Sequence, residues 1–283
     1  MSFDLDKFLY EMDDNAPSDE KIEDKVNSEE PSNKDDLLEE YALFMDSGRH
    51  SSAYIIYKPR YYALKIKDEL KNAKQEYDKI RFKGQQFSKF KDFYAFSNIR
   101  EIFKDTTGVF GYMSINSGRV IGMPGTCNRS NEIREIAARD GFGKLMFIIA
   151  LAKESPVMPS REYVSQTGYD YWRDFSSDVN IDKNKFDNEM GLHKKTNSDC
   201  KVYHDPILDK SFKTKEDNSI IIQPLLNRHR VFLNQMKNYF EKIGVDYIQT
   251  RIKDYIVDAG NYFFDEQIGD QGWYQSFDVE EED

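Results

Sequence analysis

The sequence predicts an α/β fold with a central mixed β-sheet, and three features of the chain support it. Short runs rich in aromatic and β-branched residues lie between residues 109 and 136, which is typical of strands. A glycine-containing turn at 139–143 then leads into apolar residues at helical spacing. Two further helical stripes lie between residues 219 and 268. Strands combined with such amphipathic helices indicate a sheet covered by helices.

Both ends of the chain are acidic, whereas its body is mildly basic. Residues 1–46 carry 16 Asp and Glu against 4 Lys, and residues 278–283 carry five carboxylates. We expect residues 1–35 to form an acidic disordered arm, because their polar composition cannot offset the entropy of folding. The arm serves either as a solubilising segment or as a docking segment for a basic protein partner. Residues 269–283 form an acidic tail.

The composition also bears on ligands and compartment. Residues 47–277 hold 36 basic against 30 acidic groups, which favours an anionic, phosphate-bearing cofactor over nucleic acid. Cys127 and Cys200 are too few for a disulfide framework, and the four histidines lack metal-site spacing, so we expect no metal. The first residues lack the features of a signal peptide, and no apolar run is long enough to span a membrane. We therefore expect a cytoplasmic protein.

Residues 36–106 are expected to form a largely helical first part of the body. Tyr54–Tyr57, closed by Pro59, predicts a strand, and the apolar stripe over 66–80 predicts a long helix after it. The segment 87–103 interleaves aromatic and basic residues, which favours a helix with a buried aromatic face over a base-stacking surface. A first helix is predicted before Gly48 by apolar residues at helical spacing: Leu37, Leu38, Tyr41, Phe44 and Met45.

Residues 107–175 contain the predicted sheet. Val109–Ile115 and Val120–Met123 are expected to form strands joined by a hairpin turn at 116–119, and Asn131–Ile136 a third strand. Leu145 begins the apolar stripe of the helix that follows. Residues 176–218 are polar and are expected to be loops, and residues 219–268 to form a C-terminal helical pair. The pair includes His229, for which a packed or capping role is expected.

Gly141 and Gly143 stand where the third strand passes into this helix. Glycines at a helix entry let backbone N–H groups approach a phosphate, and the helix N-terminus adds partial positive charge. The pattern favours a diphosphate site, although glycine pairs also serve close packing and tight turns.

This turn resembles the cofactor signature of GNAT-type N-acetyltransferases, in particular a divergent group encoded by tailed bacteriophages. The signature has Gln or Arg three residues before its first glycine, whereas this chain has Ala138 there and Arg139 one place later. The resemblance extends over about Val109 to Phe264 and rests on blocks that follow in the same order: Cys127-Asn128, Glu132-Ile133, Ala137 to Gly143, Val164-Ser165, Tyr171-Trp172, Asp199-Cys200 and Leu225 to His229.

The resemblance implies a GNAT-like central mixed sheet flanked by helices, with the acidic arm before it and the helical pair after it. It implies an acetyl-CoA-dependent N-acetyltransferase acting on an unidentified amine, with a coenzyme A thioester as partner. The alternative is a non-catalytic phage protein that uses the fold in virion assembly or in binding a host factor. The compartment implied is the host cytoplasm or the virion itself.

The resemblance also assigns roles to residues. Glu132 or Glu135 is the expected base that deprotonates the amine, with exposed strand residues as the alternative reading of both. The family's proton-donating Tyr would fall seven residues after Ser165, at Trp172, so the neighbouring Tyr171 is the remaining candidate acid. Cofactor contacts are expected from the strand end and the turn: Ile136, Ala138, Arg139, Asp140, Gly141, Phe142, Gly143 and Lys144.

Overall fold

The computed structural model describes residues 41–48, 50–82, 90, 97–116, 131–160, 164–185, 205–215, 217–247 and 249–271. All of these belong to one compact unit, residues 38–283. Several predicted features lie outside the described residues: the acidic arm 1–35, the strand Val120–Met123, Cys127, Cys200 and most of the acidic tail.

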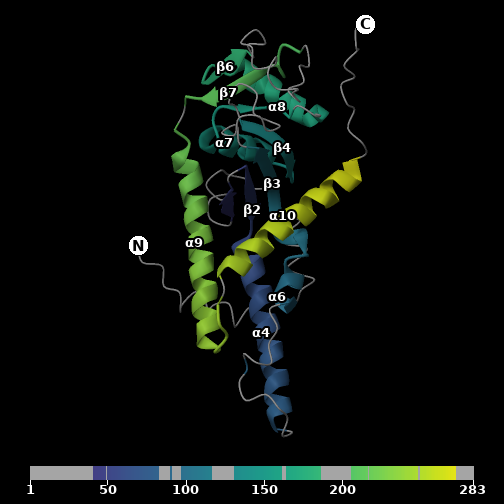
Figure 1. The fold of residues 1–283 in the computed structure, drawn as a ribbon, viewed down its shortest axis with the longest axis vertical. Helices are drawn as coiled ribbons and strands as arrows, with labels where there is room; N and C mark the ends of the chain where they lie inside the picture. Colours follow the sequence, from purple (N-terminus) through teal and green to yellow (C-terminus); the bar gives the residue numbers. More distant parts are fainter. Residues whose placement is uncertain are drawn as a thin grey trace. The chain divides into compact units, whose positions relative to one another are not determined.

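The described part of the chain forms one seven-stranded mixed sheet in the order β1-β2-β3-β4-β5-β7-β6 (Figure 1). Every neighbouring pair is antiparallel except β4 and β5, which are parallel. The prediction of an α/β fold on a central mixed sheet is therefore confirmed. The strands are β1 (Ala42–Ser47), β2 (Ser51–Tyr57), β3 (Val109–Asn116), β4 (Asn131–Ala138), β5 (Val157–Met158), β6 (Ile181–Lys185) and β7 (Lys210–Thr214).

Helices cover both faces of this sheet. A side chain at Gly111 of β3 would meet the Met146 sulfur, whereas the next residue, Tyr112, packs its ring 5.5 Å from that of Phe264. Because successive strand residues point to opposite faces, α7 and α10 lie on opposite faces. The helices are α4 (Pro59–Phe82), α6 (Ser97–Ile102), α7 (Gly143–Lys153), α8 (Gln166–Ser177), α9 (Ser219–Lys242) and α10 (Gln249–Gln271), with a short 3₁₀ turn η1 (Thr106–Gly108).

Much of the sequence-based element assignment is confirmed. The strands predicted at 54–57, 109–115 and 131–136 correspond to β2, β3 and β4, and the stripes at 66–80 and from Leu145 correspond to α4 and α7. The C-terminal helical pair corresponds to α9 and α10. In α9, His229 has the expected packed role, since it is buried and its Nδ1 lies 2.8 Å from the Tyr57 hydroxyl.

The helix predicted before Gly48 is wrong, because the described part of that segment is the edge strand β1. Residues 41–44 are all buried, and such a short continuous apolar run fits a buried strand as well as a helix. Tertiary contacts decide between the two. β1 pairs antiparallel with β2 and α9 packs against it, while the Arg228 guanidinium of α9 donates to the carbonyl of Tyr41, the residue before β1.

The polar interval 176–218, expected to be loops, contains strands β6 and β7. They pair antiparallel with each other, and β7 joins the sheet through the pairing of Val157 with Phe212. Lys, Asp, Asn and Ser dominate both strands, which hides their strand character in the sequence. Their few apolar residues, Ile181 and Phe212, are buried and anchor them.

Candidate functional site

The candidate site lies where β4 separates from β5. Only Asn131 and Glu132 of β4 pair with β5. On the other side of β4, Ser114 of β3 pairs with Glu135 and Ile115 with Ile133, so Arg134 is an extra, bulged residue. A bulge bends its strand and increases the local twist. The remainder of β4 therefore continues without a strand partner on its β5 side among the described residues.

A small cavity of about 50 Å³ lies at this gap. Its walls come from β4, from the segment after β5 and from three helices, and they are mainly apolar. Glu135 is the only carboxylate among the described residues that line it. The lining residues are Ile133, Arg134, Glu135 and Ile136 of β4, Phe147 of α7, Ser160, Val164 and Ser165, Gly168 and Trp172 of α8, and Phe264 and Ile268 of α10.

Glu135 is held in a fixed orientation at the cavity wall. The Ser114 hydroxyl donates to its Oε2 at 2.7 Å, and the Tyr112 hydroxyl donates to the same oxygen at 3.2 Å. Burial and the Glu135 charge raise the pKa of Tyr112, so this phenol stays protonated. Both donors use Oε2, and within the described part of the chain no group donates to Oε1. One oriented carboxylate oxygen therefore remains available as a proton acceptor.

The two carboxylates predicted as alternative bases have different environments. Glu132 is only 1% exposed, still pairs with β5 and does not line the cavity. Glu135 is half-buried and does line it. The reading as an exposed strand residue is wrong for Glu132, whereas Glu135 is partly exposed. The geometry favours Glu135 alone as the candidate base.

The glycine turn follows directly from β4 and leads into α7. Gly141 has a φ of 84°, a left-handed conformation that glycine adopts without strain. The Arg139 N–H donates to the Phe110 carbonyl and the Phe142 N–H to the Arg139 carbonyl. The N–H groups of Asp140, Gly141 and the first turn of α7 remain as donors, because the first N–H groups of a helix have no partner within it. This arrangement can bind an anion.

The side chains of the turn divide into buried and exposed ones. Phe142 is buried, with its ring 4.8 Å from that of Tyr41 and 5.2 Å from that of Phe110. Asp140 and Lys144 are exposed, while Ala138 ends β4. Phe142 therefore anchors the turn, whereas the side chains of Asp140 and Lys144 face solvent.

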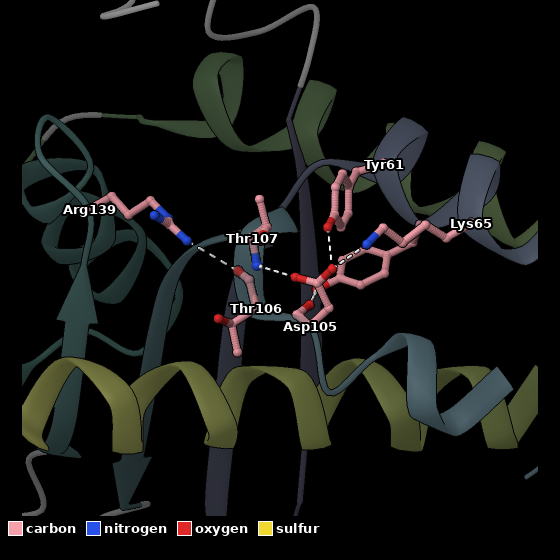
Figure 2. Close-up of polar contacts among 7 residues, drawn as sticks. Tyr61, Lys65, Asp105, Thr106, Thr107 and Arg139 are labelled. Carbon is pink, nitrogen blue, oxygen red and sulfur yellow. Dashed lines mark hydrogen bonds and ion pairs between the residues drawn. The ribbon is translucent and has the colours of Figure 1, made fainter. Parts of the chain in front are cut away.

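Arg139, a predicted cofactor contact, is engaged inside the protein. Its Nε donates to the Val109 carbonyl at 2.8 Å and its Nη2 to the Thr106 carbonyl at 3.3 Å. Its guanidinium also lies over the rings of Phe110 and Phe263, 5.4 and 5.5 Å from their centroids. Figure 2 shows the side chain reaching from the turn to η1. Arg139 thus ties the turn to η1.

The N-terminal end of η1 carries a cluster of charged and polar groups around its N-cap, Asp105 (Figure 2). The Tyr61 hydroxyl, the Lys65 ammonium and the Thr107 N–H all donate to the Asp105 carboxylate. Burial opposes its ionisation, but these hydrogen bonds outweigh burial and lower the pKa of Asp105 to about 2. The pKa values of Tyr61 and Lys65 are raised, which leaves neither as a base near neutral pH. The cluster caps η1 and clamps it to α4.

Gly143 and Tyr171, both predicted site residues, contact each other. A Cβ at Gly143 would lie 2.6 Å from the Tyr171 hydroxyl, so glycine is needed there for close packing of α7 on α8. Tyr171 does not line the cavity. Its hydroxyl lies at the N-terminus of α7, beside the turn and away from the expected acid position next to Glu135.

Ser165 opens α8 as expected, since it is the N-cap and its hydroxyl accepts a hydrogen bond from the Gly168 N–H. Seven residues later, Trp172 is 2% exposed and lines the cavity. Its ring lies 5.1 Å from that of Phe147 and 4.9 Å from that of Phe212. The position to which the resemblance assigns the proton-donating Tyr is therefore an apolar wall.

Sequence reasoning missed Tyr112, Ser114 and the α10 wall. The alternation of Tyr112 and Ser114 on one face of β3 was a usable signal, because Ser114 pairs directly with Glu135 and Tyr112 lies two residues earlier on the same face. Phe264 and Ile268 carry no local signal, since they reach the cavity only through the packing of α10.

Comparisons with known proteins add no assignment. No family model, no curated protein and no solved structure matches the chain. Within the described ranges, no group of three or more His, Cys, Asp or Glu could hold a metal ion, and no helix is long and apolar enough to cross a membrane.

Proposed function

We propose that this chain is an acetyl-CoA-dependent N-acetyltransferase with a GNAT-like fold. The observation that carries the proposal is the cavity beside Glu135, at the gap where β4 leaves its parallel neighbour β5. The same strand leads into the glycine turn, so the turn that would bind an anion and the Glu135 carboxylate lie along one strand. A cofactor with a diphosphate at one end and a reactive group at the other suits this spacing.

The residues that would hold coenzyme A follow from this arrangement. Backbone N–H groups of Asp140, Gly141 and the start of α7 would bind the diphosphate. Beyond Glu132, the β5 side of β4 has no strand partner among the described residues, so its backbone groups can bond an extended arm. Coenzyme A would supply an acetyl thioester whose carbon–sulfur bond breaks as the amine nitrogen bonds to the carbonyl carbon.

Glu135 would prepare the amine for this attack. Its Oε1 accepts a proton from the bound ammonium, which frees the nitrogen lone pair. Ser114 and Tyr112 hold Oε2 and so fix the direction of Oε1. Apolar side chains beside the carboxylate, Trp172 and Phe264 among them, would strengthen its interaction with a cation, because they lower the local dielectric constant.

A second candidate function is that of a non-catalytic GNAT-like phage protein used in virion assembly or host-factor binding. Trp172 favours it, because this residue packs in the core where the family has a proton-donating Tyr. The small volume of the cavity, about 50 Å³, favours it too.

A thiol-release assay with acetyl-CoA and a panel of primary amines tests the proposal. The wild-type protein should release coenzyme A in an amine-dependent manner, and Glu135→Gln should lower kcat by about 10²–10⁴-fold, the usual contribution of a general base. Glu101→Gln changes an exposed carboxylate of α6 and should leave kcat unchanged. Coenzyme A binding without amine-dependent release would reject the enzyme and support the non-catalytic alternative.

A further inference from the structure

The cavity wall contributed by α10 raises the question of which amine the site accepts. Phe264 and Ile268 are four residues apart, so they lie on one stripe of the helix, and both line the cavity. Ile268 and four residues of β4 line the same small cavity. An acceptor that reaches Glu135 along this wall must be slender and apolar along its stem.

The charge in the cavity lining is the second constraint. Glu135 is the only described carboxylate in the lining, and its Oε1 accepts no hydrogen bond from the described residues. Asp265 of α10 is exposed and adds negative charge close to Tyr112, the partner of Glu135. A cation would therefore be bound at Glu135 in preference to a neutral group of the same shape.

We propose that the acceptor is an unbranched primary alkylammonium, such as a lysine side chain or a linear amine, with its stem on Phe264 and Ile268 and its ammonium at Glu135. Ile268 determines the width of the acceptor and Glu135 its charge. This inference rests on the proposed function for the identity of the reaction. The binding preference itself can be measured without coenzyme A.

Trp172 provides the readout, because it lines the same cavity. The chain has two tryptophans, so a Trp273→Phe background leaves Trp172 as the only indole. Fluorescence is then titrated with butylammonium, with tert-butylammonium as the branched probe and with 1-butanol as the uncharged one. Butylammonium should give a saturable change, and the other two should bind at least about tenfold more weakly, as expected for loss of fit or of a charge-assisted hydrogen bond.

Two variants and one control assign the preferences to residues. Glu135→Gln should bring butylammonium to the affinity of 1-butanol, and Ile268→Ala should admit tert-butylammonium to within about threefold of butylammonium. Val257→Ala is the matched control, since this half-buried residue lies eleven positions earlier on nearly the same face of α10. It should leave both ratios unchanged.

The outcomes separate this inference from the proposed function. No saturable response to butylammonium up to about 50 mM, or equal affinities for all three probes, overturns the acceptor assignment. If Ile268→Ala leaves the affinity ratio of butylammonium to tert-butylammonium unchanged, Ile268 does not determine the width of the acceptor. If the amine preferences hold while acetyl-CoA neither binds nor turns over, the acceptor site stands and the acetyltransferase proposal fails.

Discussion

His229 should make the protein lose stability in mild acid. Burial, with Lys253 and Arg230 nearby, lowers the pKa of this histidine from 6.5 to about 4. The unfolded chain therefore binds more protons than the folded chain between these two values, so stability falls as pH decreases through this window. The full shift corresponds to about 3 kcal/mol, of which about 2 kcal/mol should be lost between pH 7.5 and pH 5.

Urea denaturation at pH 7.5 and pH 5 measures this loss. His229→Gln keeps a side-chain acceptor for the Tyr57 hydroxyl but cannot titrate, so it should be less stable at pH 7.5 and nearly independent of pH in this range. His50→Gln removes an exposed histidine and should behave as the wild type. A wild-type loss below about 0.5 kcal/mol, or the same loss in His229→Gln, would refute the reasoning.

Three further predictions concern the hydrogen bonds of Asp105 and the close packing at two glycines. Asp105→Asn should lower the free energy of unfolding by about 1–3 kcal/mol and reduce the loss of stability between pH 4 and 2, because the carboxylate with the lowered pKa is gone. In the same denaturation assay, Asp78→Asn should cost under about 0.5 kcal/mol, because Asp78 forms an exposed pair with Lys74. Gly143→Ala should cost about 1–2 kcal/mol, and a double-mutant cycle with Tyr171→Phe should recover part of it, because the new Cβ meets the Tyr171 hydroxyl. Gly260→Ala should lower the melting temperature by several degrees, since its Cβ would lie 2.7 Å from side chains of β2 and β3. Additive effects in the cycle, or neutral substitutions at the two glycines, would contradict this packing.

The sequence predicts most strands and helices of the body because their apolar patterns are long or end at turn residues such as Gly and Pro. It fails at residues 41–47, where a run of four buried residues has no diagnostic period, and only pairing with β2 and contact with α9 select a strand. It fails again at β6 and β7, because β6 is the edge strand and β7 pairs with β5 through a single residue pair, which tolerates polar residues at most of their positions.

The candidate site was predictable only in part. The glycine turn is a local pattern, and its position between β4 and α7 is as expected. The choice between Glu132 and Glu135 depends on the bulge at Arg134, which sequence periodicity does not reveal. Phe264 and Ile268 join the site only through the packing of α10, so no local pattern could identify them.

Calorimetric titration with acetyl-CoA tests the central claim, a coenzyme A site at the turn between β4 and α7. Gly141→Asp and Gly141→Asn add side chains of equal size, and both residues tolerate the left-handed backbone, but only Asp adds a charge against the diphosphate. Gly244→Asp is the control, because Gly244 also has a positive φ, of 75°, and open space around its Cβ position. We predict saturable binding to the wild type and to Gly244→Asp, with Gly141→Asp at least about tenfold weaker than Gly141→Asn, a difference of about 1.4 kcal/mol. No binding at millimolar acetyl-CoA, or equal affinities for the two Gly141 variants, would contradict the claim.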